Sequence, residues 1–250
     1  MEAPGWLWPV LASPFVGSFL GVLVTRLPEG RPVTGGRSVC DHCGQRLGPL
    51  DLVPIASWLA LRGRCRHCGG KITALPLVME LGALLAALWA ATVSDGWALW
   101  AGCVLGWTLL TLAAIDWRDG ILPDVLTLPL VAAGLVATEF LSPWQILDSA
   151  IGAVAGFAIF ALIRWLYRLL RGREGLGLGD AKLLAAAGAW VTWDGVPGVV
   201  LTAAATGLAI ALVMGWRGEE QVSLNQRIAF GPALCFGTWL VWLYGPITVF

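Results

Sequence analysis

The sequence predicts an all-α membrane protein that crosses the bilayer about eight times. Of its 250 residues, 58% are hydrophobic and only 13% are charged, whereas about a quarter of the residues in soluble domains are charged. The mean hydropathy is +0.77. Equal numbers of basic and acidic residues, 16 of each, leave no positive surplus for a nucleic-acid partner. The composition thus excludes disordered, fibrous and disulfide-dense secreted proteins and is typical of an integral membrane protein.

The apolar residues come in continuous runs, and a helix needs ~20 of them to span a bilayer. A transmembrane barrel would instead show short segments of alternating polarity. The first run is interrupted by Pro14, has no basic residue before it and is followed by Arg26, so we expect a retained helix and not a signal peptide. The predicted spans are 9–24, 75–93, 98–115, 125–141, 146–170, 183–191, 198–214 and 230–250.

The charges predict the orientation of these eight segments. All 16 basic residues fall in one alternating set of loops and their flanks, and the opposite loops contain only acidic charges. Because cytoplasmic loops are enriched in Lys and Arg, we expect the basic loops in the cytoplasm and both termini on the other side. The predicted divisions are a first transmembrane helix (1–25), a cytosolic zinc-binding loop (26–73) and a transmembrane core (74–250).

The loop contains two copies of the pattern C-x-H-C-G, which predict a structural zinc site with Cys40, Cys43, Cys65 and Cys68 as ligands. About 48 residues cannot bury enough apolar surface to fold alone, so a metal would substitute for a core. The alternatives are two disulfides, a redox pair, or a histidine ligand in place of a cysteine. A cytoplasmic position argues against disulfides, and we expect His42 and His67 at solvent-facing tips. The remaining cysteines, 103 and 235, are expected to be buried small hydrophobic residues.

Two carboxylates at the cytoplasmic membrane edge are the candidate catalytic residues, since ionisable groups in membrane segments are usually functional. Asp116 ends the third segment, and Asp180 lies in the sequence Gly-Leu-Gly-Asp at the start of the sixth. A pair of this kind can share a proton and hydrolyse a peptide bond. The alternatives are that Asp180 complements a helix dipole and that Asp119 and Asp124 are simply solvated. We expect Glu80, in the second segment, to pair with an arginine of the loop.

Several further motifs accompany these candidates along nearly the whole chain. They are Gly17-Ser18-Phe19-Leu20, Arg26-Leu27-Pro28, Pro54-Ile55-Ala56-Ser57-Trp58-Leu59, Leu61-Arg62-Gly63-Arg64-Cys65, Pro76-Leu77-Val78-Met79-Glu80, Ile115-Asp116, Ile121-Leu122-Pro123-Asp124, Leu126-Thr127-Leu128-Pro129, Gly177-Leu178-Gly179-Asp180 and Phe230-Gly231-Pro232. Together with the double cysteine pattern, they resemble the bacterial type IV prepilin peptidases, the GxGD class of membrane aspartic proteases.

The resemblance implies that Asp116 and Asp180 are the catalytic pair of an inner-membrane enzyme. Its substrates would be type IV prepilins and the pseudopilins of type II secretion, cut on the cytoplasmic side after a short basic leader. The resemblance also implies N-methylation of the new N-terminal residue from S-adenosylmethionine, because the zinc loop accompanies the bifunctional members. No Rossmann-type glycine fingerprint supports a methyl-donor site, so this activity rests on the resemblance alone.

Two other classes of function compete with this interpretation. A non-hydrolytic zinc-binding scaffold would use the carboxylates only as helix-end caps. A proton-coupled transporter would use them as relays, but it should place them near the bilayer midplane in broken, repeated helices.

Overall fold

The structure is a computed structural model that describes residues 5–34, 38–172, 177–216 and 230–246. Within these ranges all named secondary-structure elements are helices. The only β pairing there consists of two isolated bridges, Val39 with Arg46 and Arg64 with Lys71. The all-α prediction is therefore confirmed.

Residues 247–250 of the last predicted segment lie outside the described residues. Apart from one or two residues at the ends of the second and last segments, the predicted apolar segments otherwise lie in helices. These are α1 (Leu7–Arg26), α3 (Leu75–Ala91), α4 (Gly96–Asp119), α5 (Asp124–Leu141), α6 (Ile146–Arg171), α7 (Leu178–Trp216) and α8 (Gly231–Tyr244). Among the described residues, α1, α4, α5, α6 and α7 are long and apolar enough to cross a membrane, while α3 is a shorter apolar helix. The short helix α2 (Ala56–Ala60) and two 3-10 turns (Pro49–Leu52 and Pro143–Gln145) complete the elements.

Helix α7 contains both the sixth and the seventh predicted segments. Its 39 residues are interrupted at Thr192, whose φ of 62° and ψ of 177° are not helical. This residue follows directly after Val191, where the sixth segment was expected to end. The chain thus changes direction at a single residue where the sequence predicts a loop.

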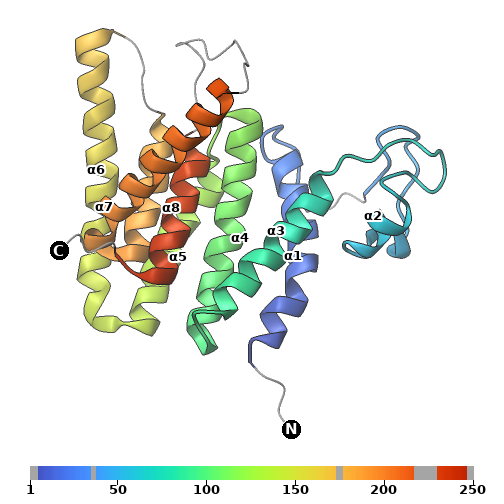
Figure 1. Ribbon diagram of the computed structural model, residues 1–250, viewed down its shortest axis with the longest axis horizontal. Coiled ribbons are helices and arrows are strands. Elements are labelled where there is room, and N and C mark those ends of the chain that lie inside the picture. The colour runs from blue at the N-terminus through green and yellow to red at the C-terminus, as the bar shows by residue number, and fades with distance from the viewer. Residues whose placement is uncertain (1–4, 35–37, 173–176, 217–229, 247–250) are drawn as a thin grey trace. The chain divides into compact units, whose positions relative to one another are not determined.

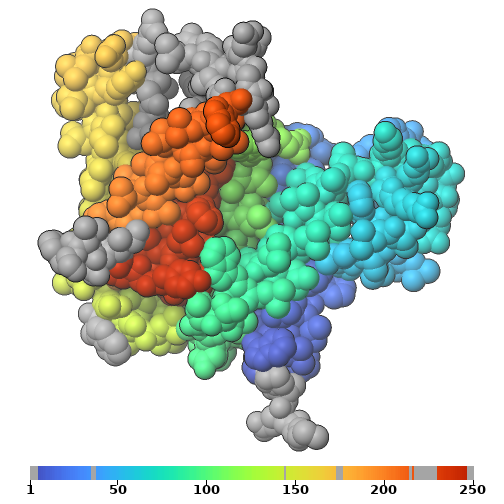
Figure 2. Space-filling view, in the orientation of Figure 1, coloured from blue at the N-terminus to red at the C-terminus, as the bar shows by residue number. Residues whose placement is uncertain are grey.

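The chain divides into two compact units, Met1–Thr111 and Leu112–Phe250, with the boundary inside α4. In the first unit α1 packs against α3, and the segment between them carries the cysteines and α2 (Figure 1). Gly17 makes this packing possible, because a Cβ there would lie 2.5 Å from the Cα of Glu80. The space-filling view shows the cysteine segment as a rounded lobe at the end of α3 (Figure 2). The divisions at residues 25 and 73 stay a prediction.

In the second unit, α7 packs against α5, α6 and α8. Glycines bring α6 and α7 into backbone contact, since a Cβ on Gly156 would lie 2.5 Å from the carbonyl oxygen of Leu184. The indole N–H of Trp190 in α7 donates to the Leu130 carbonyl of α5 at 2.9 Å. A Cβ on Gly237 of α8 would lie 2.7 Å from the Val199 oxygen of α7. These contacts hold α5, α6 and α8 against α7, the helix that contains Asp180.

Candidate active site and metal centre

Asp116 lies near the C-terminal end of α4, inside the second unit, and is only 7% exposed. Its Oδ2 accepts a hydrogen bond from the backbone N–H of Gly231, the first residue of α8, at 3.1 Å. The free N–H groups and the dipole of a helix N-terminus stabilise a carboxylate. A Cβ on Gly231 would lie 2.5 Å from that same oxygen. A larger residue at this position would therefore displace the carboxylate or the start of α8.

Asp180 is the third residue of α7, and its carboxylate accepts a hydrogen bond from the N–H of Gly177. A Cβ on Gly179 would lie 3.0 Å from the Cβ of Leu122, in the turn between α4 and α5. Gly177 and Gly179, the two glycines before Asp180, thus make different contacts. Gly177 folds back over the carboxylate, and Gly179 lets the start of α7 lie close to the turn that follows Asp116.

The two aspartates belong to the same unit, and their charges are close enough to interact. Cys235, one turn into α8 and buried as expected, lies within range of both charges. Two carboxylates that share one proton can act together as a base and an acid on a bound carbonyl and water. The arrangement has the groups that aspartic hydrolysis needs.

The neighbouring acidic residues have partners of their own. Both oxygens of Asp124 contact the ammonium of Lys182, at 2.6 and 2.8 Å, which ties the first turn of α5 to the first turn of α7. Asp119 forms an ion pair with Arg118 at 3.7 Å. The sequence did not reveal the partnership of Lys182 with Asp124. It also gave no role to the N–H of Gly231, although Phe230-Gly231-Pro232 stood out as a motif.

The cysteine segment brings Cys40, Cys43, Cys65 and Cys68 together, with all four sulfur atoms within 4.8 Å of one another. All four are free thiols, so the disulfide alternative has no support. The sulfurs of Cys40 and Cys68 are 3.9 Å apart. Four thiolates at roughly 2.3 Å from a tetrahedral zinc would be separated by roughly 3.8 Å. The donor set therefore fits a zinc ion, and these cysteines are the residues that would hold it.

The two cysteine patterns form matched turns. In each turn the glycine after the second cysteine donates its N–H to the carbonyl of the first cysteine, Gly44 to Cys40 at 2.8 Å and Gly69 to Cys65 at 2.9 Å. Both glycines have positive φ, 67° and 70°. Backbone N–H groups of Cys68 and His67 lower the pKa of Cys65 to about 6. Such N–H groups favour the thiolate that zinc requires.

The histidines lie outside the sulfur cluster. His67 is exposed, as predicted for a solvent-facing tip. The Nε2 of His42, also on an exposed side chain, is 3.0 Å from the carbonyl oxygen of Lys71, and so this ring links the first turn to the end of the second.

Comparisons with known proteins agree with these observations. The type IV leader peptidase family matches residues 103–212, and the bacterial Peptidase A24 N-terminal domain matches residues 11–94. A protein of Burkholderia pseudomallei (strain 1026b) is 43% identical over 89% of this chain and 80% of its own. Relatives from Aeromonas hydrophila (38% identical, 94% of this chain and 89% of theirs) and Dickeya chrysanthemi (39%, 92% and 89%) are similar.

All three relatives are named prepilin leader peptidase/N-methyltransferase. No solved structure matches the chain. The identities are well above the level at which a family is established, and they extend over most of each protein. The chain therefore belongs to the type IV leader peptidase family of membrane aspartic proteases, as its motifs predict.

Proposed function

We propose that this protein removes the leader from type IV prepilins and type II secretion pseudopilins and then N-methylates the new N-terminal residue. The observation that carries the peptidase is the buried carboxylate of Asp116, held by the N–H of Gly231 and within charge range of Asp180. The relatives named prepilin leader peptidase/N-methyltransferase support the substrate class and the second activity.

In the proposed reaction, the ionised carboxylate takes a proton from water while the protonated one polarises the scissile carbonyl. The resulting tetrahedral adduct loses the amine, which takes a proton and becomes the N-terminus of the mature pilin. Gly231 contributes by fixing one oxygen of Asp116 through its N–H. The glycines before Asp180 act by close packing, Gly177 against the carboxylate itself and Gly179 against Leu122.

The position of the aspartates supports a hydrolase over a proton-coupled transporter. Asp116 is three residues from the end of α4 and Asp180 is the third residue of α7, whereas transporter sites lie near the bilayer midplane. A non-hydrolytic zinc-binding scaffold would not explain why Asp116 is buried against α8, because burying a carboxylate costs free energy.

We further propose a bacterial inner-membrane location, with the zinc loop and the active site on the cytoplasmic side and both termini in the periplasm. The separation of basic from acidic loops supports this orientation. Zinc in the four-cysteine site would be structural, because four protein ligands leave no position for water or substrate. S-adenosylmethionine would supply the methyl group.

The deciding experiment uses the purified full-length protein, a synthetic prepilin and S-adenosylmethionine, with mass spectrometry of the products. We expect loss of the leader, followed by a gain of one CH₂ on the mature fragment. An intact prepilin after incubation with folded, zinc-loaded protein would contradict the proposal. Cleavage without methylation would retain the peptidase and refute the second activity.

A further inference from the structure

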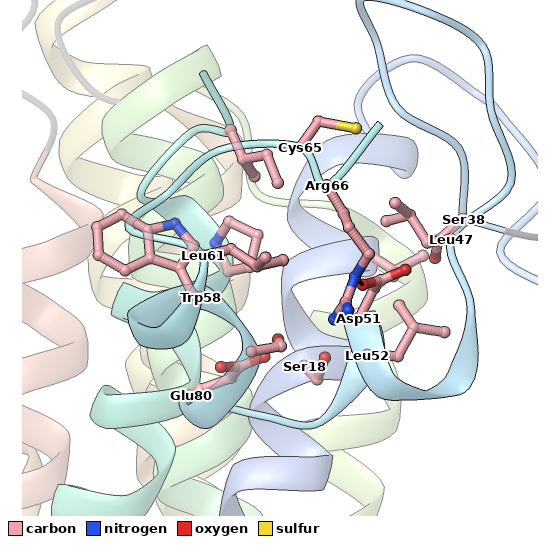
Figure 3. Close-up of a pocket in the computed structure, with 14 residues that line it drawn as sticks. Ser18, Ser38, Leu47, Asp51, Leu52, Trp58, Leu61, Cys65, Arg66 and Glu80 are labelled. Carbon is pink, nitrogen blue, oxygen red and sulfur yellow. Dashed lines mark hydrogen bonds and ion pairs between the residues drawn. The ribbon is translucent and has the colours of Figure 1, made fainter. Parts of the chain in front are cut away.

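The first unit contains a cavity that the peptidase reaction does not use. It has a volume of about 150 Å³ and lies between α1, α3 and the cysteine segment (Figure 3). Most of its wall is apolar, and its polar groups come from a few side chains. The polar and aromatic side chains in its wall include Ser18, Asp51, Trp58, Arg66 and Glu80.

Glu80 places a buried carboxyl group at one end of this cavity, next to Ser18 (Figure 3). The residue is 5% exposed, and its Oε2 accepts the N–H of Ile55 at 2.6 Å. The loop thus meets Glu80 through a backbone group and not through the arginine expected from the sequence. In the described part of the chain no lysine or arginine forms a salt bridge with this carboxylate. A buried carboxylate is costly unless a cation compensates it, so the cavity suits a positively charged ligand.

A second charged group lies on another wall. The Nε of Arg66 donates to Oδ1 of Asp51 at 2.8 Å, and the other oxygen of Asp51 accepts the N–H of Gly48 at 3.1 Å. This fixes the guanidinium and leaves its remaining N–H groups for a carboxylate, which arginine binds well. Trp58 contributes an aromatic ring whose N–H donates to the Thr73 carbonyl at 3.3 Å, so its orientation is fixed too.

These groups together match one class of ligand. A phosphate or a lipid acyl chain would place a negative or an apolar group against Glu80, which is unfavourable. An amino-acid derivative fits Glu80, Arg66 and Trp58 together if it carries, besides its amino and carboxylate groups, a further positive charge and a nucleobase. Glu80 would face the cation, Arg66 the carboxylate, and Trp58 the base.

We propose that this cavity and the side chains that line it bind S-adenosylmethionine, with Glu80 as the counter-ion of its sulfonium. The inference rests on the proposed methyltransferase function and gives it a site. In the transfer, the amine nitrogen of the freed pilin N-terminus forms a bond to the methyl carbon. The carbon–sulfur bond breaks with its electron pair staying on sulfur, which becomes a neutral thioether, and the amine releases one proton to water.

The test measures the affinity of the purified full-length protein for S-adenosylmethionine and for S-adenosylhomocysteine, which lacks the positive sulfur. Glu80→Gln keeps an oxygen for the Ile55 N–H and removes only the charge. Ser18→Leu instead fills the cavity from α1. Glu139→Gln, an exposed position on α5 in the other unit, is the matched control.

We expect Glu80→Gln to weaken S-adenosylmethionine binding by roughly 10-fold or more, as the loss of a buried charge pair does. Binding of S-adenosylhomocysteine should change much less, so the preference for the charged ligand disappears. A purely structural role of Glu80 would weaken both ligands alike. Ser18→Leu should weaken both, and Glu139→Gln neither. Zinc content, measured in parallel, checks that each variant is folded.

Two outcomes would overturn the inference. One is unchanged affinity and ligand preference in Glu80→Gln while the wild type binds and methylates. The other is that the variant loses affinity for a pre-cleaved pilin peptide but not for S-adenosylmethionine, in which case the cavity holds the pilin ammonium. A wild type that cleaves but neither binds the donor nor methylates would refute the proposed methyltransferase itself, a result distinct from both.

Discussion

The cysteine cluster and the aspartate pair are built in opposite ways. The four cysteines lie within 29 residues of one another, and each matched turn is closed by hydrogen bonds inside its own short segment. Asp116, Asp180 and Gly231 come from three helices spread over more than 110 residues, and glycine contacts bring them together. A local site depends on its ligands and on the metal that they would hold. A site assembled from distant helices depends on the packing that surrounds it.

The largest expected effect is at the aspartates. Asp116→Asn and Asp180→Asn should each reduce leader cleavage by roughly 10³-fold or more, because an amide can neither accept the proton from water nor return it. Cleavage of a synthetic prepilin by the purified variants measures this. Asp119→Asn, which alters only an exposed ion pair, is the control and should retain most activity. Near-normal cleavage by Asp116→Asn or Asp180→Asn would show that these two aspartates are not the catalytic pair.

The next prediction asks whether the two regions serve separate reactions. Asp180→Asn should leave methylation of a pre-cleaved pilin peptide intact, because members of one site fail together while separate sites fail separately. Incorporation of labelled methyl groups into that peptide is the measurement. If Asp180→Asn abolished methylation with the fold intact, both activities would share one site. Disrupting the cysteine segment should, conversely, impair methylation at least as strongly as proteolysis.

Loss of a single ligand should disable the local site completely. Cys40→Ser or Cys65→Ser should lower the bound zinc from one per chain to a small fraction and expose the cysteine segment to proteases, since metal binding supplies much of its folding energy. Metal analysis and limited proteolysis under reducing conditions measure both. Cys103→Ala, a buried cysteine outside the cluster, should retain its zinc. Full zinc content in the ligand variants would show that other residues bind the metal.

These two regions also differ in how far the sequence predicts them. Hydropathy located the apolar helices of the described residues, although two predicted segments belong to the single interrupted helix α7. The spacing of the four cysteines predicted a cluster that the structure brings together. Such features are local, so a pattern along the chain is sufficient. The positions of Asp116 and Asp180 at one membrane edge predicted the pair, and the resemblance supported it, but the sequence did not predict which groups surround them.

What the sequence did not reveal depends on contacts between distant segments. The hydrogen bond from Gly231 to Asp116 joins residues 115 positions apart, and no periodic pattern in the sequence predicts it. The sequence likewise does not predict that Glu80 accepts a hydrogen bond from the backbone N–H of Ile55, which lies 25 residues earlier in the chain. A backbone N–H is present at every non-proline residue, so its use by one particular carboxylate becomes visible only in three dimensions.

Gly231 tests the dependence of the aspartate pair on packing. In Gly231→Ala the new methyl group would collide with Oδ2 of Asp116, so α8 or the carboxylate must shift. We expect cleavage to fall by roughly 10-fold or more, because small displacements of catalytic groups are costly. Gly207→Ala is the matched control, since no atom lies within 4 Å of a Cβ at this α7 position. Equal activity of the two variants would show that the contact with α8 does not position Asp116.

The smallest effect is expected at the ion pair between Lys182 and Asp124. It joins the first turns of α7 and α5 two residues beyond Asp180, but its carboxylate is 57% exposed. Exposed ion pairs contribute roughly 0–1 kcal/mol. Asp124→Asn should therefore lower cleavage only by roughly 2- to 5-fold, and a rise in salt should reduce the difference from the wild type. Kinetics at low and high ionic strength measure this. If Asp124→Asn abolished cleavage at every salt concentration while Asp116→Asn did not, Asp124 would be the first catalytic aspartate, and the carboxylate buried against α8 would have only a structural role.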